Sequence, residues 1–378
     1  MENVRNLIEA SFPDVKNFKK EIDVKIECLE NARSFWSECY RVTLTPKNAE
    51  IMYKVVSPLF IKVSRISDTN SCLDADNEEE NTKILLKLSE RETQFLNDFR
   101  NFDFKNFPIP RNFLAIDIDL DKTPGGLVSE DLSGFAKSVQ YIPGFTDSQM
   151  LQILRALAGF HFSVLSKSNE ILWENYENSL YDADYINMLY NDTLDLENIV
   201  PDQFAGKIQS IKHIFNTDSV RIAQESDKLQ NMPEVLSHND LNSSNILWNT
   251  ENGKIAGFID FQHLARGSIV FDIIRLLTLG LSVEKRRENT IRYLQFYYDS
   301  LAELLGDELN FTFEQLLLSF HTHFGFVSAT TLFGCYYYYK MYNEDSINLA
   351  EKQNSSSDAQ EILNRALGII EDIEKLRK

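Results

Sequence analysis

The chain has 378 residues, of which 43% are hydrophobic and 12% aromatic, so a disordered polypeptide is excluded and two lobes are expected. The formal net charge of −19 argues against nucleic acid and against an anionic membrane surface as partners. Four scattered cysteines and no run that approaches a membrane span predict a soluble, cytoplasmic protein.

The first part of the chain contains strand-like runs, and one of them holds a lysine of interest. Residues 59–63 predict a strand with Lys62 inside it, and Lys54 is a rival for the same role. Residues 81–99 predict an amphipathic helix whose apolar stripe includes Glu92. Because an unpaired carboxylate in such a stripe is costly, we expect Glu92 to pair with Lys62.

The chain after residue 132 is predicted to be mainly helical. Thr146 and Gln149 form a capping-box pattern ahead of an apolar helix, and His161 keeps the helical spacing of that helix. Histidines in such positions are most often satisfied core residues, so we expect His161 to be structural. Residues 168–232 predict two or three helices without a recognisable chemical motif.

The most informative stretch is residues 233–277. A polar loop between two short strands holds His238, Asp240 and Asn245, and an Asn-Gly tight turn then returns the chain to Asp260. We expect this hairpin to bring the three polar loop residues and Asp260 into one small volume. A carboxylate there can orient or deprotonate a hydroxyl, and carboxylate and amide oxygens are the ligands that Mg²⁺ prefers.

The sequence His-Asn-Asp-Leu-Asn-Ser-Ser-Asn-Ile-Leu-Trp, followed by Ile-Asp-Phe-Gln, resembles kinase-like small-molecule phosphotransferases. These include aminoglycoside phosphotransferases, choline kinases and the ecdysteroid-kinase-like (CHK kinase-like) family, and the resemblance extends from about residue 60 to 339. It implies an α+β, protein-kinase-like fold with two lobes. The expected lobes are a small mixed β-sheet lobe at residues 1–132 and a larger, mainly helical lobe at residues 133–378.

The resemblance also implies a role for each residue of the site. The expected catalytic residue, as base or orienter of the acceptor, is Asp240. The expected magnesium ligands are Asn245 and Asp260. The expected contacts to ATP are Lys62, held by Glu92, on the phosphates, and the linker residues Glu130, Asp131 and Leu132 on the adenine. The expected supports of the catalytic loop are His238 and Asp272, although Asp272 could instead cap a helix.

The implied activity is ATP- and Mg²⁺-dependent phosphorylation of a hydroxyl on a small molecule, with a sterol-like compound or an amino alcohol such as choline as acceptor. Gln262 stands two residues beyond Asp260, where a protein kinase has glycine. Only eleven residues separate Asp260 from Asp272, which leaves no room for a peptide-docking segment. A small-molecule acceptor is therefore favoured over a protein.

Two alternatives stay open. The segment where a kinase turn covers the phosphates has no glycine, and its weak candidates for phosphate contact are Ser34, Phe35 and Ser37. A catalytically silent pseudokinase that binds a ligand or partner is therefore the second hypothesis. A zinc site built from His238, Asp240 and His263 is also conceivable, but it lacks a convincing ligand set.

Overall fold

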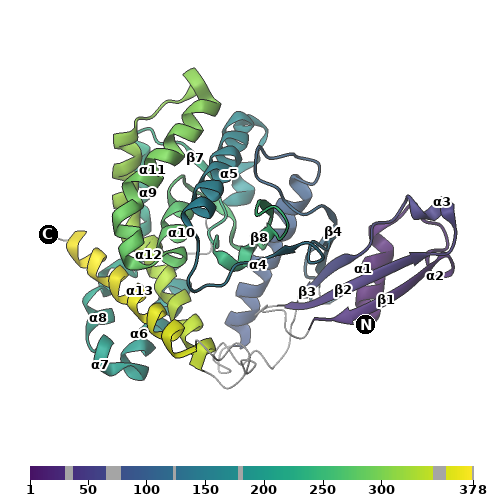
Figure 1. Cartoon of the computed structure of the whole chain (residues 1–378), viewed down its shortest axis with the longest axis horizontal. Helices are drawn as coiled ribbons and strands as arrows, with labels where there is room; N and C mark the ends of the chain where they lie inside the picture. Colours follow the sequence, from purple (N-terminus) through teal and green to yellow (C-terminus); the bar gives the residue numbers. More distant parts are fainter. Residues whose placement is uncertain (30–36, 65–77, 122–124, 178–181, 344–354, 377–378) are drawn as a thin grey trace. The chain divides into compact units, whose positions relative to one another are not determined.

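The computed structural model describes residues 1–29, 37–64, 78–121, 125–177, 182–343 and 355–376. The chain divides into two compact units, whose elements are labelled in Figure 1. Unit 1 consists of Met1–Asp103, Pro108–Lys137 and Asn249–Leu264, and unit 2 of Phe104–Phe107, Ser138–Trp248 and Ala265–Lys378. The predicted first lobe, residues 1–132, does not include the third segment of unit 1.

Unit 1 is built on a five-stranded antiparallel sheet with the strand order β1-β2-β3-β5-β4. Its strands are β1 (Ile22–Cys28), β2 (Ser37–Pro46), β3 (Leu59–Ser64), β4 (Asn112–Ile116) and β5 (Gly126–Glu130). Its helices are α1 (Glu2–Ser11), α2 (Phe18–Glu21), α3 (Ala49–Met52) and α4 (Glu78–Asp98). The short strands β6 (Ala136–Lys137) and β9 (Ile255–Phe258) complete the unit.

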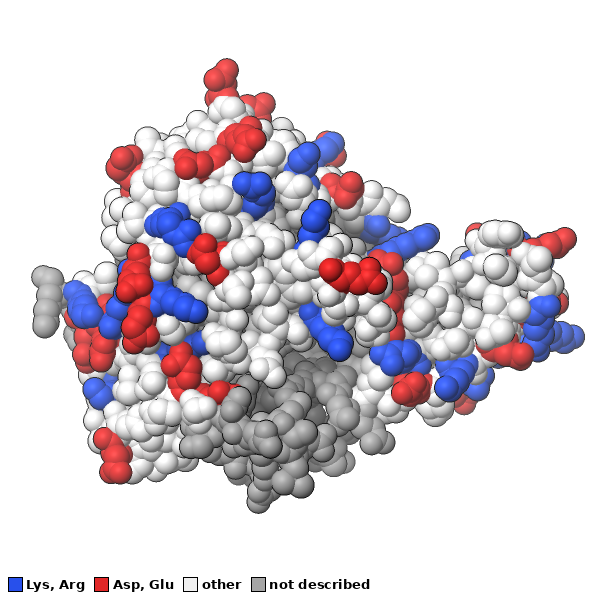
Figure 2. Space-filling view, in the orientation of Figure 1, with Lys and Arg blue, Asp and Glu red and all other residues white. Residues whose placement is uncertain are grey.

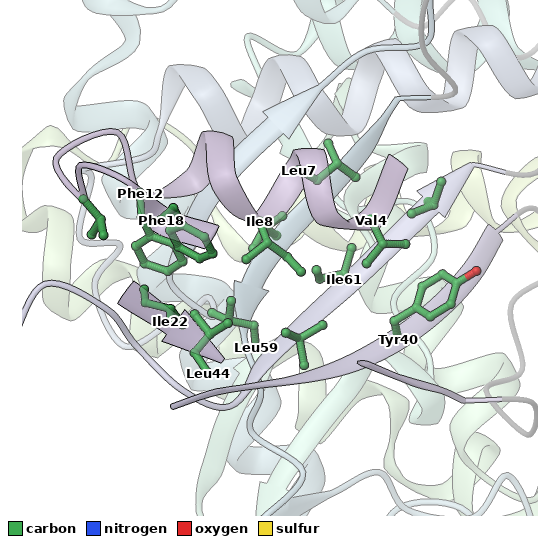
Figure 3. Close-up of a cluster of buried hydrophobic side chains, with 14 of the residues drawn as sticks. Val4, Leu7, Ile8, Phe12, Phe18, Ile22, Tyr40, Leu44, Leu59 and Ile61 are labelled. Atoms are coloured by element: carbon green, nitrogen blue, oxygen red, sulfur yellow. The ribbon is translucent and has the colours of Figure 1, made fainter. Parts of the chain in front are cut away.

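The core of unit 1 lies between α1 and one face of this sheet. Figure 3 shows Ile8 of α1 on the side of the helix that faces Leu59 and Ile61 of β3. Burial along β3 alternates strictly, because successive side chains of a strand point to opposite faces. Lys62 therefore lies on the face of β3 opposite to this core.

Unit 2 is mainly helical. Its helices are α5 (Asp147–Ser166), α6 (Ala183–Ile199), α7 (Pro201–Phe204), α8 (Lys207–Ser210), α9 (Thr217–Leu229), α10 (Phe271–Gly280), α11 (Val283–Leu305), α12 (Phe313–Asn343) and α13 (Ser355–Leu376). Strand β7 (Glu234–Ser237) pairs antiparallel with β10 (Ala265–Ser268), and β8 (Ile246–Asn249) follows the polar loop. The combination of a small antiparallel sheet and many helices matches the predicted α+β class.

Helix α5 begins with the predicted capping box, in which the side chains of Thr146 and Gln149 each accept a backbone N–H. His161 is fully buried in this helix, and its Nδ1 lies 2.6 Å from the hydroxyl of Tyr297. Burial lowers the pKa of His161 to about 3. The prediction of a structural core histidine is consistent with this environment.

Helix α12 differs from expectation. Its stretch Phe313–Lys340 is, among the described residues, the one helix long and apolar enough to cross a membrane by length and composition. The sequence was expected to contain no run that approaches a membrane span, so this helix departs from that expectation by length and composition. Of its most apolar window, 67% is buried inside the protein, as in a core helix.

The charged side chains on the face drawn in Figure 2 are of mixed sign. Lys and Arg are interspersed with Asp and Glu over the described part of this face. The acidic excess of the chain is therefore not gathered into one region of it.

Candidate active site

Three charged side chains converge within unit 1. The Lys62 Nζ lies 2.8 Å from Glu92 Oε2 on α4 and 2.8 Å from Asp260 Oδ1, which follows β9. The predicted contact between Lys62 and Glu92 is present, and the contact of Lys62 with Asp260 adds to it. The rival Lys54 is exposed in the turn after α3.

The three side chains are shielded from water to different degrees, since 15% of Lys62, 8% of Glu92 and 27% of Asp260 is exposed. Burial by itself lowers the pKa of Lys62, but the charges of Asp260 and Glu92 outweigh it and raise the pKa. Burial raises the pKa of Glu92 against the opposing effect of Lys62. Lys62 therefore stays cationic, whereas the ionised form of Glu92 depends on the positive charge of Lys62.

The backbone around Asp260 fixes this arrangement. Asp260 has φ +69°, a left-handed conformation that is uncommon for a residue other than glycine. The next amide, the N–H of Phe261, donates to Glu92 Oε1 at 3.1 Å. Glu92 therefore uses one oxygen for Lys62 and the other for the chain beside Asp260. Such conformations are concentrated at functional sites.

The predicted adenine contacts lie at the end of β5, and their main-chain N–H groups differ in whether they already have a hydrogen-bond acceptor. The N–H of Glu130 donates to Arg111, and that of Asp131 donates to Pro58. Within the described part of the chain, the amide of Leu132 has no hydrogen-bond acceptor. The main-chain donor that suits a nucleobase in this window is therefore that of Leu132.

The Asp131 side chain has a different partner. It accepts a hydrogen bond from Arg41 Nε on β2 at 2.7 Å and another from the amide of Ser133. Burial opposes ionisation, but the bonds from Ser133 and Arg41 prevail and lower the pKa of Asp131. This carboxylate secures the linker to the sheet.

In unit 2, Asp272 holds the loop that contains Asp240. Its two carboxylate oxygens accept the N–H groups of His238 and Asn239, each at 2.8 Å. Asp272 is 1% exposed, and burial raises its pKa. Asn239 has φ +60°, which the two bonds to Asp272 help to stabilise. Asp272 thus bonds the main chain of the loop in addition to lying in the first turn of α10, and its role in supporting the site stays a prediction.

His238 and Asn245 complete the internal bonding of the loop. The N–H of Asp240 donates to His238 Nδ1 at 3.3 Å, which is the kind of bracing expected of His238. The Asn245 amide nitrogen donates to Asp240 at both the main-chain oxygen, at 2.8 Å, and Oδ2, at 2.9 Å. The amide oxygen of Asn245 is therefore turned away from Asp240.

The sequence reasoning missed Arg275. Its Nη2 lies 2.5 Å from Asp240 Oδ1, and its Nη1 donates to the Thr330 hydroxyl at 3.0 Å. Arg275 stands three residues after Asp272 on α10, so both face the loop. That spacing was the signal in the sequence that could have indicated it.

Oxygen donors of the kind that suit Mg²⁺ occur in both units. Asn245 presents its amide oxygen, and Asp260 is a partly exposed carboxylate. These donors fit a hard cation, and the predicted approach of Asp260 to Asp240 and Asn245 stays a prediction. No three His, Cys, Asp or Glu side chains of the described residues gather into a metal-binding group, so nothing supports the zinc alternative.

The phosphate-turn candidates are only partly described. Ser34 and Phe35 lie outside the described residues. Ser37 is buried at the start of β2 and lines a pocket together with Lys62, Glu92 and Gln262. A pocket thus adjoins the buried lysine in unit 1.

Comparison with solved structures identifies the fold. An ethanolamine kinase from Plasmodium vivax has a TM-score of 0.50 at 13% identity and covers 97% of this chain and 86% of its own. The GDP complex of aminoglycoside 2'-phosphotransferase-IIIa scores 0.51 at 14% identity, covering 97% and 99%. Choline kinase LicA from Streptococcus pneumoniae scores 0.50 at 13% identity, covering 98% and 99%. The predicted protein-kinase-like fold is confirmed.

Comparison with curated proteins gives nearer relatives. A Caenorhabditis elegans protein named "Uncharacterized kinase-like protein D1044.1" is 48% identical over 373 residues, covering 98% of this chain and 99% of its own length. The C. elegans protein named "Uncharacterized oxidoreductase dhs-27" is 24% identical over 233 residues, which are 57% of this chain and 28% of that protein. A family model described as "DUF1679: Uncharacterized oxidoreductase dhs-27" matches residues 36–378. The chain belongs to this DUF1679 family.

Proposed function

We propose that the protein transfers the γ-phosphoryl group of ATP to a hydroxyl of a small molecule, with Mg²⁺ as the metal. The observation that carries the proposal is the convergence of Lys62, Glu92 and Asp260, which places a buried cation between two carboxylates. A purely structural unit gains little from burying such a triad, because desolvation offsets most of its attraction. Binding of the phosphates of ATP by the Lys62 cation would explain why the triad is buried.

In this reaction Lys62 binds the phosphates of ATP, and Glu92 fixes the position of its ammonium group. The Leu132 amide receives the adenine. Asp240 accepts a hydrogen bond from the acceptor hydroxyl and so aims its oxygen at the γ-phosphorus. The new O–P bond forms as the bond from the γ-phosphorus to the bridging oxygen of ADP breaks, and the hydroxyl proton passes to the Asp240 carboxylate.

Asn245 and Asp260 would hold the metal through their side-chain oxygens. When bound, Mg²⁺ supplies positive charge that offsets the charge of the phosphate oxygens. The printed name of one structural neighbour records a complex with GDP, which supports the use of a nucleotide. Cys28, Cys39 and Cys335 are free thiols, which fits the reducing cytoplasm.

The acceptor belongs to the small alcohols. Two structural neighbours are named ethanolamine kinase and choline kinase, so amino alcohols are one class to test. Sterol-like alcohols are the other class, on the resemblance to ecdysteroid-kinase-like proteins. No segment for docking a peptide fits between Asp260 and Asp272.

The first experiment is calorimetry of ATP binding with and without Mg²⁺. We expect Mg²⁺-dependent binding by the wild type, its loss in Asp260→Asn, and no change in the matched control Asp23→Asn, which alters an exposed strand carboxylate. Asp240→Asn should still bind ATP but lose transfer to sterols, choline or ethanolamine by about 10²-fold or more. A folded wild type that binds no ATP would replace this proposal with the pseudokinase.

A further inference from the structure

Helix α10 contacts the catalytic loop through two side chains of different charge. Asp272 accepts two main-chain N–H groups of the loop, whereas Arg275 binds the side chain of Asp240. The two residues are three apart, which places them on the same face of the helix. One face of α10 therefore fixes both the path of the loop and the direction of its carboxylate.

The pair of Arg275 and Asp240 is not a solvent-exposed ion pair. Only 12% of the Arg275 side chain and 19% of the Asp240 side chain is exposed. The guanidinium is also tethered at its other end, because Nη1 donates to the Thr330 hydroxyl of α12 at 3.0 Å. Thr330 in turn donates to the Val327 carbonyl at 2.7 Å, so the tether is itself fixed.

The bonds at Asp240 are divided between its two oxygens. Arg275 lies at Oδ1 and the Asn245 amide at Oδ2. Donors on both oxygens prevent rotation of the carboxylate about its terminal bond. In phosphoryl transfer most of the rate enhancement comes from positioning and from charge stabilisation. A carboxylate that rotates would orient the acceptor hydroxyl less well than one that is held in place.

We propose that Arg275 is a positioning residue for phosphoryl transfer, which acts by holding the Asp240 carboxylate in the orientation that receives the acceptor hydroxyl. This inference rests on the proposed function. Arg275 acts through Asp240, so its loss should lower kcat and leave ATP binding intact. A lysine at this position keeps the charge but loses the two-armed contact to Asp240 and Thr330.

The test compares Arg275→Gln, Arg275→Ala, Arg275→Lys and the control Arg221→Gln, which alters an exposed arginine of α9. The assay measures transfer from ATP to the acceptor that the wild type phosphorylates in the screen above. We expect Arg275→Gln to lower kcat by about 10²-fold with the KM for ATP within about twofold, and Arg275→Lys to retain an intermediate kcat. Added guanidinium ion at low millimolar concentration should restore part of the activity of Arg275→Ala, because the truncated side chain leaves room for the ion.

Two results would overturn the inference. The first is an unchanged kcat in Arg275→Gln. The second is a lowered kcat with an equally impaired KM and no recovery of Arg275→Ala in guanidinium, which would make Arg275 merely structural. If Arg275→Gln does not fold, Thr330→Val tests the inference instead, because it removes only the hydrogen bond that tethers the guanidinium. We expect it to lower kcat by about two- to fivefold, and an unchanged kcat in that variant refutes the inference. A wild type that neither binds nor uses ATP would refute the proposed function instead.

Discussion

Replacing Lys62 by Met tests the buried triad directly. The change removes the cation that lies 2.8 Å from both Glu92 and Asp260 while keeping most of the side-chain volume. Removing one partner of a buried pair costs about 3–5 kcal/mol, whereas exposed pairs contribute about 0–1 kcal/mol. Glu92 is 8% exposed and is left unpaired, but Asp260 is 27% exposed and water can reach it. We therefore expect the lower end, a loss of about 3 kcal/mol in the free energy of unfolding.

The assay is urea unfolding at pH 7, with Lys25→Met as the control on an exposed position of β1. The deficit should shrink as the pH falls toward 5, because burial raises the pKa of Glu92 and a protonated Glu92 needs no cation. The wild type should gain no pH slope from Lys62 in this range, since its pKa is raised and it stays charged. A deficit below about 1 kcal/mol, or one that grows on acidification, would refute the reasoning.

Three further predictions concern unit 2. Asp272→Asn, which can no longer accept two N–H groups with a charged carboxylate, should lower the free energy of unfolding by about 2 kcal/mol and speed amide hydrogen exchange in residues 238–245; unaltered exchange would contradict its support of the loop. Gly159→Ala should destabilise by about 1–3 kcal/mol in urea unfolding, because a Cβ there would lie 1.9 Å from the Lys105 carbonyl oxygen, whereas Gly134→Ala meets nothing within 4 Å and should be near neutral. Burial holds the pKa of His161 at about 3, below its unfolded value of about 6.5. The contribution of the neutral His161 to the free energy of unfolding is therefore complete above pH 6.5 and falls with the pH, by about 2 kcal/mol at pH 5. His161→Gln should flatten this slope when unfolding is measured from pH 7 to 5.

The contact between Lys62 and Glu92 was predictable because two local periodicities determine it. The alternation of β3 places Lys62 away from the apolar core, and the helical repeat of α4 places Glu92 within an apolar stripe. A carboxylate in that stripe needs a cation or hydrogen-bond donors, and Lys62 was the cation that the neighbouring strand offered. For the same reason the helix predicted at residues 81–99 corresponds to α4, Glu78–Asp98.

Other parts of the site could not be predicted, because no local pattern encodes them. The left-handed backbone of Asn239 and Asp260 occurs without glycine, so its sequence signal is absent. The spacing from Asp272 places Arg275 on the loop-facing side of α10, but neither periodicity nor propensity specifies Asp240 as its partner. Residues 30–36 of the glycine-free phosphate turn lie outside the described residues, and its contact with phosphate stays a prediction.

The three-segment composition of unit 1 has a consequence for how the protein is made. Lys62 and Asp260 are separated by 198 positions in the chain, and a little more than half of that interval, residues 104–107 and 138–248, belongs to unit 2. On the ribosome, at roughly 5–20 residues per second, Lys62 and Glu92 emerge many seconds before Asp260 does. Until that late segment is made, Lys62 lacks its second carboxylate and Glu92 lacks the hydrogen bond from the N–H of Phe261. Fragments that end near residue 137 lack Asn249–Leu264, the third segment of unit 1, so we expect them to be less stable than the same residues in the whole chain.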